Sequence, residues 1–497
     1  MGVPAMAVET DYYTVLGVSR SATAQEIQKT YHALARRLHS EATQDVTLAE
    51  QFRRVQEAYK VLSDPEKRLE YDRQQAGDKM AGEPAINLQV TLSHRSLPCL
   101  DEDQMLYAMI EITPSPHIEM RRLLLNLCLV LDRSTSMQGL RLQRVKEATH
   151  YIIDYLNDED ILSIVTFSDR AEVVLSGQRL DDRVRIKALV SAIRSSGGTE
   201  IFQGLQTGLI ELERVRSPEM INHLILLTDG QTYGDEEKCL LAADRASRHQ
   251  IGISTMGIGQ DWNDKLLDEI ALRSGGTSAY IDSAAKVISF FRDKVHSLVN
   301  VFARELRYTL EFGEGVRLKD SFLVSPYIAR LQEREGGFHL GQLSADTPTV
   351  ILLECLISPK LPGLHRLFQL ELVGDVPVLG RQSERIKREV EVNFAPTREL
   401  EETVPPRIVS ALGKLAIFKM QEKTMSDLER GQVEQASQRL ETMATRLLNI
   451  GELELAKSAL LEAGRLARSG HLSPEGRKKI RYGTRSLSLL PKEVKGD

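Results

Sequence analysis

The sequence lacks the features that mark several large protein classes. Its 497 residues include only four cysteines, Cys99, Cys128, Cys239 and Cys355, which form no CxxC pair, so we do not expect a zinc site. No Asn-x-Ser/Thr sequon occurs. The first residues, MGVPAMAVETDYY, contain neither a basic segment nor a long apolar core, so they do not resemble a secretory signal. These absences predict a reducing, cytoplasmic location.

Charge and motifs argue against further classes. The 64 basic and 70 acidic residues give a net charge of −6, which does not indicate binding to nucleic acid or to a membrane surface. We expect no membrane span, because the longest apolar runs are shorter than the about 20 residues that a spanning helix needs. The motifs GxxxxGK[ST], HExxH and GxSxG are absent, and Trp262 stands where a dinucleotide loop after Gly257 and Gly259 would need a third glycine. We therefore expect a binding protein and not an enzyme.

What remains is a chain of ordinary composition, 42% hydrophobic and 27% charged, which can build large cores. Its length suggests about three domains. The hydrophobic period changes along the chain, and a Gly/Ala/Pro-rich stretch reads as a linker. The predicted divisions are a helical domain at 10–75, a linker at 76–85, sandwich strands at 86–120, an α/β domain at 121–300, the remainder of the sandwich at 301–397 and a helical region at 404–490.

The regions that flank the α/β domain share a strand pattern. The simplest arrangement pairs Ile86–Ile112 with residues 301–395 in one β-sandwich, so that the α/β domain is inserted in, or flanked by, that sandwich. Glu354 lies within the apolar run TVILLECLI and is expected to be a partly exposed sheet residue. The helical region predicts two amphipathic helices. From His471 to the end, seven basic and three acidic residues predict a solvated basic tail.

Residues 10–75 have the pattern of a small antiparallel helical domain. Thr23-Ala24-Gln25-Glu26 has the spacing of a capping box at the start of a helix. The segments DYYTVLGV (11–18) and FRRVQEAYKVLSDPEKRLEYDR (52–73) resemble the DnaJ-type J domain. Apolar residues recur at helical spacing at Ile27, Tyr31, Leu34 and Leu38, and again at Phe52, Val55, Tyr59 and Leu62.

The J-domain family carries a His-Pro-Asp tripeptide in the loop between its two long helices, and here that tripeptide is His39-Ser40-Glu41. The resemblance implies a surface that stimulates a heat-shock chaperone ATPase. The basic face of that surface would include Lys29, Arg36 and Arg37, although such residues are also typical of a solvated helix face. Ser40 lacks the fixed φ of proline, and Glu41 holds its carboxylate one methylene further out. We therefore expect that the stimulation is lost.

Residues 121–300 alternate between strand and helix patterns, which is typical of a doubly wound, Rossmann-like α/β domain with a parallel sheet. The central strand is the apolar run in Leu123–Met137, LLLNLCLVLDRSTSM, which ends at an aspartate followed by alternating hydroxyls. Ligands bind beyond the carboxyl ends of parallel strands, so Asp132, Ser134 and Ser136 are expected at a binding edge. The same residue types also cap helices, and this spacing alone does not separate the two roles.

Two further segments favour a metal site. Ser196-Gly197-Gly198-Thr199 precedes a helix pattern, and Thr228-Asp229-Gly230 ends another strand pattern, so both loops can converge on the same edge of the sheet. The combined set has two aspartates, two serines and one threonine, and contains neither histidine nor cysteine. Such hard oxygen ligands select magnesium first, with manganese or calcium as alternatives.

With these segments in place, the stretch from Leu123 to Asn300 resembles the von Willebrand factor A (vWA) domain. That family has a metal-ion-dependent adhesion site (MIDAS), written DxSxS, then Thr, then Asp. The resemblance implies a divalent cation that bridges to an acidic residue of a protein partner, which is binding chemistry without turnover. The family's ligands map onto Asp132, Ser134, Ser136, Thr199 and Asp229.

The sequence thus favours a metal-ion-dependent protein-binding scaffold. The alternative is a J-domain co-chaperone that recruits a heat-shock chaperone ATPase to clients held by the vWA domain. The tripeptide at 39–41 is the feature that discriminates between the two functions.

Overall fold

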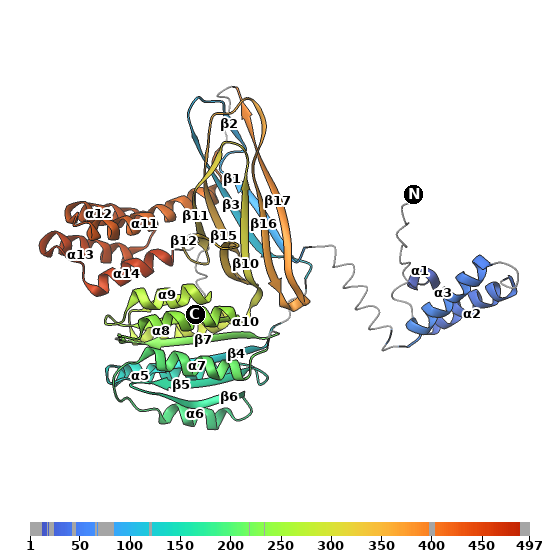
Figure 1. The fold of residues 1–497 in the computed structure, drawn as a ribbon, viewed down its shortest axis with the longest axis horizontal. Coiled ribbons are helices and arrows are strands. Elements are labelled where there is room, and N and C mark those ends of the chain that lie inside the picture. Colours follow the sequence, from blue (N-terminus) through green and yellow to red (C-terminus); the bar gives the residue numbers. More distant parts are fainter. Residues whose placement is uncertain are drawn as a thin grey trace. The chain divides into compact units, whose positions relative to one another are not determined.

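The computed structural model describes residues 12–16, 18, 24–41, 46–64, 67, 84–118, 122–217, 219–232, 234–396 and 403–487. The chain divides after Pro84 into two compact units (Figure 1). The multidomain class expected from the sequence is confirmed, with N-terminal helices, a mainly parallel α/β sheet, antiparallel sheets and a C-terminal helical domain. Among the described helices, none combines the length and the apolar character of a bilayer span.

The N-terminal unit contains α1 (Tyr12–Leu16), α2 (Ala24–Glu41) and α3 (Val46–Leu62). Tyr31 of α2 stacks on Tyr59 of α3, with ring centroids 4.0 Å apart. Both tyrosines lie on the apolar stripes that the helical spacing predicted. The buried core between the helices consists of Tyr13, Leu16, Ile27, Val55, Ala58 and Leu62.

The sequence placed the tripeptide His39-Ser40-Glu41 in a loop, and the structure corrects this. Helix α2 continues through Glu41, so the tripeptide forms its last residues. A proline at position 40 would disfavour helical backbone at the preceding residue and would remove one backbone N–H, whereas serine does neither. The serine therefore permits the longer helix. The side chains of Arg36, Arg37 and the tripeptide lie outside the described residues.

In the second unit, two sheets pack face to face around one apolar core. Strands that precede the α/β domain pair with strands that follow it: Ile110 lies opposite Ile351, and Ala108 lies opposite Leu353. The α/β domain is therefore inserted into the sandwich. The first sheet has the strand order β1 (Ile86–Leu92), β3 (Gln104–Pro114), β15 (Thr349–Ile357), β11 (Val316–Ser325) and β12 (Ala329–Leu331). The second sheet has the strand order β13 (Glu333–Arg334), β14 (Gly337–Ser344), β10 (Val301–Phe312), β16 (Gly363–Val376), β17 (Arg381–Ala395) and β2 (Ser96–Pro98).

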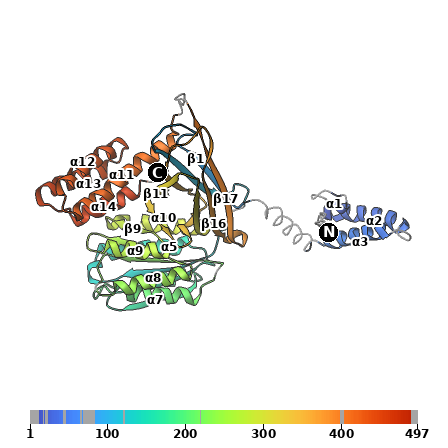
Figure 2. The same cartoon turned by 45° about the horizontal axis from the view of Figure 1, so that its top comes forward.

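The inserted domain is a twisted sheet covered by helices on both faces (Figure 2). Its strand order is β6 (Ala171–Arg179), β5 (Ile161–Phe167), β4 (Leu125–Asp132), β7 (Ile221–Thr228), β8 (Ile251–Ile258) and β9 (Ser278–Ile281), and only β6 runs antiparallel to its neighbour. One face packs against α5 (Leu140–Tyr155), α6 (Arg183–Ala192) and α10 (Val287–Val299). The other face packs against α7 (Ile201–Arg214), α8 (Glu236–Arg248) and α9 (Asp264–Ser274).

Strand β4 is buried at every position, as its apolar run predicted. Successive side chains of a strand point to opposite faces, so Leu127 and Leu129 join the core beneath α5 and α10. Cys128 and Val130 join the core beneath α7 on the other face. The strand ends at Asp132, where the first charged side chain of the run reaches the edge of the sheet.

Within residues 403–487 the chain forms α11 (Pro406–Glu429), α12 (Val433–Asn449), α13 (Leu453–Ser469) and α14 (Pro474–Arg485), which is two helices more than expected. The predicted solvated basic tail is wrong for residues 474–485. Lys478 is 1% exposed, and α14 packs against the α/β domain through an ion-pair network with α9. A basic amphipathic helix and a solvated tail have the same composition, so charge alone could not separate them.

The structure also corrects the expectation for Glu354. Its side chain on β15 is only 4% exposed and pairs with Lys419 of α11, which packs over the outer face of that sheet. The sequence could not show that a helix covers this face.

Candidate metal centre

The predicted metal-binding residues lie at the carboxyl edge of the inserted sheet. Strands β4 and β7 are parallel neighbours, with Leu131 opposite Leu227, so the residues that follow them emerge side by side. Asp132 is the last residue of β4, and Asp229 follows β7 directly. The segment that carries Thr199 lies before α7 and is tied to the loop after β4, because Thr135 donates a backbone hydrogen bond of 3.0 Å to the carbonyl of Gly197.

A continuous run of hydrogen bonds connects the acids and the serines. Asp132 Oδ1 accepts from the backbone N–H of Ser134 at 2.7 Å. The Oγ atoms of Ser134 and Ser136 are 3.0 Å apart, and Ser136 Oγ donates to Asp229 Oδ1 at 2.6 Å. Thr228, which the sequence interpretation did not place in the site, donates its hydroxyl to Asp132 Oδ2 at 2.6 Å.

Thr199 approaches this cluster across Gly230. A Cβ atom at Gly230 would lie 2.8 Å from Thr199 Oγ1, so only glycine lets the hydroxyl come this close to the residue after Asp229. The Thr199 loop is shaped by Asp169, whose carboxylate accepts the N–H of Gly198 at 2.8 Å. The structure therefore brings the five predicted residues together at one edge, four of them in one run of hydrogen bonds. Whether they bind a metal stays a prediction.

Both acids of the cluster are held away from solvent. Asp132 and Asp229 are 0% and 1% exposed, whereas Ser136 is exposed at the rim. Burial raises the pKa of Asp132 to about 6, and the nearby Asp229 carboxylate acts in the same direction. Hydrogen bonds from Ser134 and Thr228 oppose this rise, because they stabilise the carboxylate. A positive charge at this edge would compensate two acids that are held away from solvent.

One such charge comes from Arg141, which the sequence interpretation missed. Its Nη1 donates to Asp229 Oδ2 at 2.5 Å, so the two oxygens of Asp229 face Ser136 and Arg141 respectively. Arg141 lies in the first turn of α5, which starts at Leu140. The positive end of the helix dipole disfavours a cation there, and this was a signal that the arginine needs a carboxylate partner nearby.

The donor set fits a hard divalent cation. Carboxylates and hydroxyls are the ligands that Mg²⁺, Mn²⁺ and Ca²⁺ use, and three of the five side chains here are hydroxyls. Within the part of the chain that the structure describes, no group of three or more His, Cys, Asp or Glu side chains is placed to hold a metal. A cation at this edge would therefore depend on Ser134, Ser136 and Thr199 as well as on the two acids.

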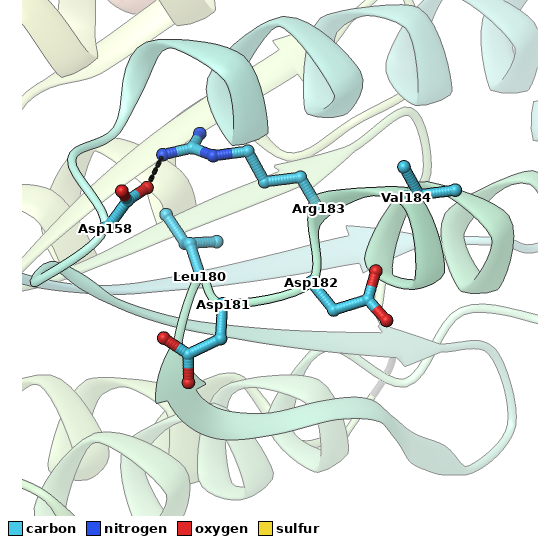
Figure 3. A pocket seen from close by; sticks show the side chains of 6 residues that line it. All are labelled: Asp158, Leu180, Asp181, Asp182, Arg183 and Val184. Carbon is cyan, nitrogen blue, oxygen red and sulfur yellow. Dashed lines mark hydrogen bonds and ion pairs between the residues drawn. The ribbon is translucent and has the colours of Figure 1, made fainter.

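A hollow in the same domain lies away from this centre (Figure 3). Asp158 precedes β5 and Leu180 follows the antiparallel β6, so the hollow lies at the opposite edge of the sheet. Arg183 pairs with Asp158 at 2.6 Å across it. None of the five candidate ligands contributes to it. Its lining residues are Asp158, Leu180, Asp181, Asp182, Arg183 and Val184.

In the N-terminal unit, the structure describes little of the predicted chaperone-contacting surface. Lys29 is exposed on α2. Arg36, Arg37 and His39 lie further along the same helix, and nothing described brings them together with Lys29 into a site.

Three family models match the chain in separate segments. The DnaJ domain matches residues 11–72, the von Willebrand factor type A domain matches residues 126–293, and the Sll0103-like C-terminal alpha-helical domain matches residues 406–490. These segments correspond to the N-terminal helices, the inserted α/β domain and helices α11–α14.

Individual relatives agree with this division. Protein sll0103 of Synechocystis sp. is 29% identical over 414 residues, which cover 82% of this chain and 98% of the relative. The chaperone protein DnaJ of Carboxydothermus hydrogenoformans is 52% identical over 66 residues, and this match covers 13% of this chain and 17% of that protein.

A solved structure shares the fold of the larger unit. The von Willebrand factor type A protein from Catenulispora acidiphila has a TM-score of 0.64 at 18% identity, covering 81% of this chain and 97% of that one. The chain therefore combines an N-terminal DnaJ domain, a von Willebrand factor type A domain and an Sll0103-like C-terminal helical domain.

Proposed function

We propose that this protein is a scaffold whose vWA domain binds an acidic residue of a protein partner through a divalent cation, Mg²⁺ in the first place. The cation would be held by Asp132, Ser134, Ser136, Thr199 and Asp229. When bound, it supplies a positive centre that a carboxylate of the partner can complete. The proposed chemistry is binding, and we do not propose an enzymatic reaction.

The observation that carries this proposal is the run of hydrogen bonds from Asp132 to Asp229. Both acids and Ser134 are buried, and Ser136 brings a hydroxyl oxygen to the exposed rim. Ser136 donates to a carboxylate, so its contacts are those of a ligand cluster and not those of a nucleophile beside a histidine base. The edge position also leaves the cluster open to a partner.

Calorimetric titration of the full chain with Mg²⁺ and with Mn²⁺ tests the cation site. We expect binding with about one ion per chain, lost in the double variant Ser134→Ala/Asp229→Ala. The matched control is Ser191→Ala/Asp181→Ala, which removes an exposed serine and an exposed aspartate of the same domain. Equal binding by all three proteins would place the cation elsewhere.

Affinity capture then tests the partner. Proteins retained by the immobilised chain in Mg²⁺ are expected to elute with chelator, and the Ser134→Ala/Asp229→Ala variant should not retain them. Mass spectrometry identifies what is captured. Retention that is indifferent both to chelator and to the double variant would refute a metal-dependent partner site.

A second candidate function is that of a J-domain co-chaperone for clients held by the vWA domain. The match of residues 11–72 to the DnaJ domain favours it, because that domain implies a heat-shock chaperone ATPase as partner. The tripeptide His39-Ser40-Glu41 disfavours it. Steady-state ATP hydrolysis by such a chaperone, with and without the full chain, separates the two. Stimulation that disappears in His39→Gln would support the co-chaperone.

A further inference from the structure

We propose that helix α14 of the C-terminal domain sets the cation affinity of the vWA site, acting through the loop between β8 and α9 and through Arg141. This inference rests on the proposed function, because it concerns the same site. The C-terminal domain would then regulate the site, because the guanidinium of Arg141 already occupies one oxygen of Asp229. The route consists of three consecutive contacts within the second unit.

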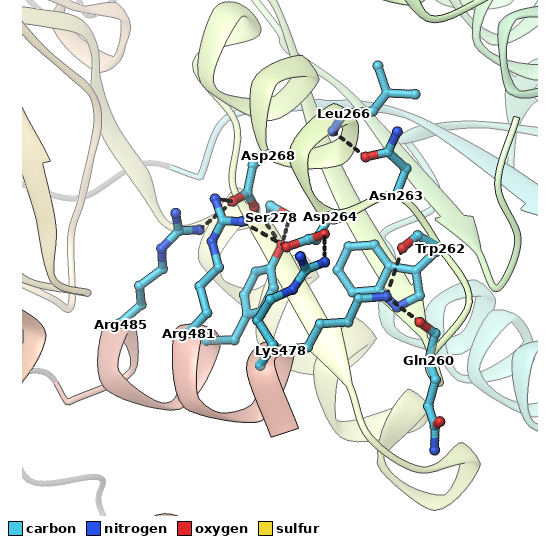
Figure 4. A network of polar contacts seen from close by, with 12 residues as sticks. Gln260, Trp262, Asn263, Asp264, Leu266, Asp268, Ser278, Lys478, Arg481 and Arg485 are labelled. Atoms are coloured by element: carbon cyan, nitrogen blue, oxygen red, sulfur yellow. Dashed lines mark hydrogen bonds and ion pairs between the residues drawn. The ribbon is translucent and has the colours of Figure 1, made fainter. Parts of the chain in front are cut away.

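The first contact joins α14 to the vWA domain, both at α9 and at the β8–α9 loop (Figure 4). Arg477 and Arg481 both pair with the carboxylate of Asp264, at 2.9 Å and 2.8 Å. Arg485 and the hydroxyl of Tyr482 contact the carboxylate of Asp268. Asp264 and Asp268 lie one turn apart on α9, so three turns of α14 are fixed along that helix. The β8–α9 loop, residues 259–263, directly precedes Asp264 in the chain.

Lys478 is the contact between α14 and the loop itself. Its side chain is almost completely buried, and its Nζ donates to the carbonyl oxygens of Gln260 at 2.5 Å and Trp262 at 2.7 Å. The same ammonium lies 4.3 Å from the centre of the Trp262 ring. From the loop side, Gln260 Nε2 donates to Glu475 of α14 at 2.8 Å. Thus α14 holds both the backbone and the indole of the loop (Figure 4).

The second step runs from the loop to Arg141. Trp262 Nε1 donates to the carbonyl of Gly259 at 2.9 Å, so the indole that Lys478 holds also fixes the start of the loop. Gly259 has φ +72°, and a Cβ atom there would lie 3.0 Å from Arg141 Nη2. The backbone of Gly259 therefore lies directly beside the guanidinium of Arg141.

The third step runs from Arg141 to the site. Arg141 Nη1 donates to Asp229 Oδ2, the oxygen that Ser136 leaves free. A divalent cation on Asp229 must share this carboxylate with the guanidinium or displace it. The guanidinium is about one third exposed, so its charge is partly screened but lies close to the ligands. The better Arg141 is held against Asp229, the weaker the cation should bind.

The same geometry predicts the reverse effect. Coupling between two sites is reciprocal in binding free energy, so a cation that weakens the Arg141–Asp229 pair should also loosen the loop and α14. This gives a second readout that does not depend on measuring affinity.

Cation titration of the full chain with single and combined variants tests the route. Arg141→Gln should bind Mg²⁺ about tenfold more tightly than wild type, because a nearby positive charge is removed. Lys478→Met retains an apolar stem against Trp262 but loses both hydrogen bonds to the loop, and should bind about threefold more tightly. In the Arg141→Gln background, Lys478→Met should add nothing, because its effect passes through the arginine.

The chain offers a matched control for each variant. Arg144, one turn further along α5, pairs with Glu147 of its own helix, and Lys457 lies at an exposed position on α13. Arg144→Gln and Lys457→Met should leave the affinity unchanged. If Lys478→Met does not fold, Gln260→Ala removes the other bond between loop and helix and should give the same direction of change.

Hydrogen exchange of the wild-type chain supplies the second readout. Saturating Mg²⁺ should increase exchange in residues 259–263 and in α14. Unchanged affinity in Arg141→Gln and Lys478→Met, or additive effects in the double variant, would overturn the coupling while leaving the cation site intact. A wild-type chain that binds no cation would overturn the coupling and the proposed function together.

Discussion

The carboxylate of Glu354, in the middle of an apolar strand of the sandwich, lies 2.6 Å from the ammonium of Lys419 on the first helix of the C-terminal domain. Glu354 is buried, whereas Lys419 is about one third exposed. The pair thus connects the sandwich to the domain that covers it, beside the apolar contacts of Phe322 and Phe418. A buried acid is tolerated there because the ammonium of Lys419 supplies both an opposite charge and a hydrogen bond to Glu354.

The first prediction concerns this pair. Lys419→Met should lower the free energy of unfolding by about 2 kcal/mol, because Glu354 keeps a buried charge without its partner, and the exposure of Lys419 reduces the full penalty. Adding Glu354→Gln should restore most of the loss, because the charge is then removed. Urea unfolding followed by circular dichroism measures both effects. Lys457→Met, at an exposed position on α13, is the control and should be neutral. A double variant as unstable as the single one would show that packing, and not charge, sets the cost.

Parts of this architecture could be predicted because they depend on local pattern. The apolar run before Asp132 predicted a strand buried on both faces, and two separate loops predicted the convergence of Thr199 and Asp229 on its edge. Arg141 was missed because it belongs to no spacing motif. Its role arises only when α5 brings it beside Asp229. Likewise, composition alone could not distinguish a basic tail from α14, because what buries Lys478 is a loop more than 200 residues away in the sequence.

The second prediction concerns the glycine beside Asp229. Gly230→Ala adds a Cβ atom that would lie 2.8 Å from Thr199 Oγ1, so the hydroxyl must move away from the other ligands. We expect Mg²⁺ affinity to fall at least tenfold with little change in the melting temperature, as read by calorimetric titration and by thermal unfolding. Gly413→Ala, on α11 with no heavy atom within 4 Å of the added methyl group, should leave the affinity unchanged. An unchanged affinity in Gly230→Ala would remove Thr199 from the ligand set.

The third prediction uses stability to report the cation. A ligand that binds only the folded chain stabilises it by about 1.4 kcal/mol when its concentration is ten times its dissociation constant. The midpoint of thermal unfolding should therefore rise with Mg²⁺ concentration in wild type and return to its starting value with chelator. The double variant Ser134→Ala/Asp229→Ala should show no such rise. A rise of equal size in that variant would mean that Mg²⁺ stabilises the chain at another position.

The fourth prediction concerns the tripeptide at the end of α2. Ser40→Pro/Glu41→Asp creates the His-Pro-Asp sequence of the J-domain family, and the proline should end the helix before position 40. We expect the full chain to gain stimulation of a heat-shock chaperone ATPase relative to wild type, measured as steady-state phosphate release. Adding His39→Gln should abolish the gain. If wild type already stimulates as strongly as the double variant, serine and glutamate are sufficient and the co-chaperone function is favoured.

The last prediction concerns pH and the buried histidine of β7. His223 lies against Gly252, and its Nε2 is 2.9 Å from Ser254 Oγ. Burial, with Lys294 nearby, lowers the pKa of His223 well below 6.5. Between that lowered value and 6.5 only the unfolded chain takes up the proton, so stability is lost as the pH falls below 6.5.

From pH 7.5 to pH 5.5, His223 should therefore cost wild type about 1.4 kcal/mol of unfolding free energy. His223→Gln keeps a polar group near Ser254, but this group does not titrate. In urea unfolding, the loss of unfolding free energy between pH 7.5 and pH 5.5 should therefore be about 1.4 kcal/mol smaller in His223→Gln than in wild type. Burial raises the pKa of Asp132 to about 6, so this group stabilises the folded chain as the pH falls, opposite to His223. Asp132 does so in both proteins, and its contribution cancels when their unfolding free energies are compared. His150→Gln, at a partly exposed histidine on α5, should follow wild type. Identical pH dependence in wild type and His223→Gln would mean that His223 takes up its proton without unfolding.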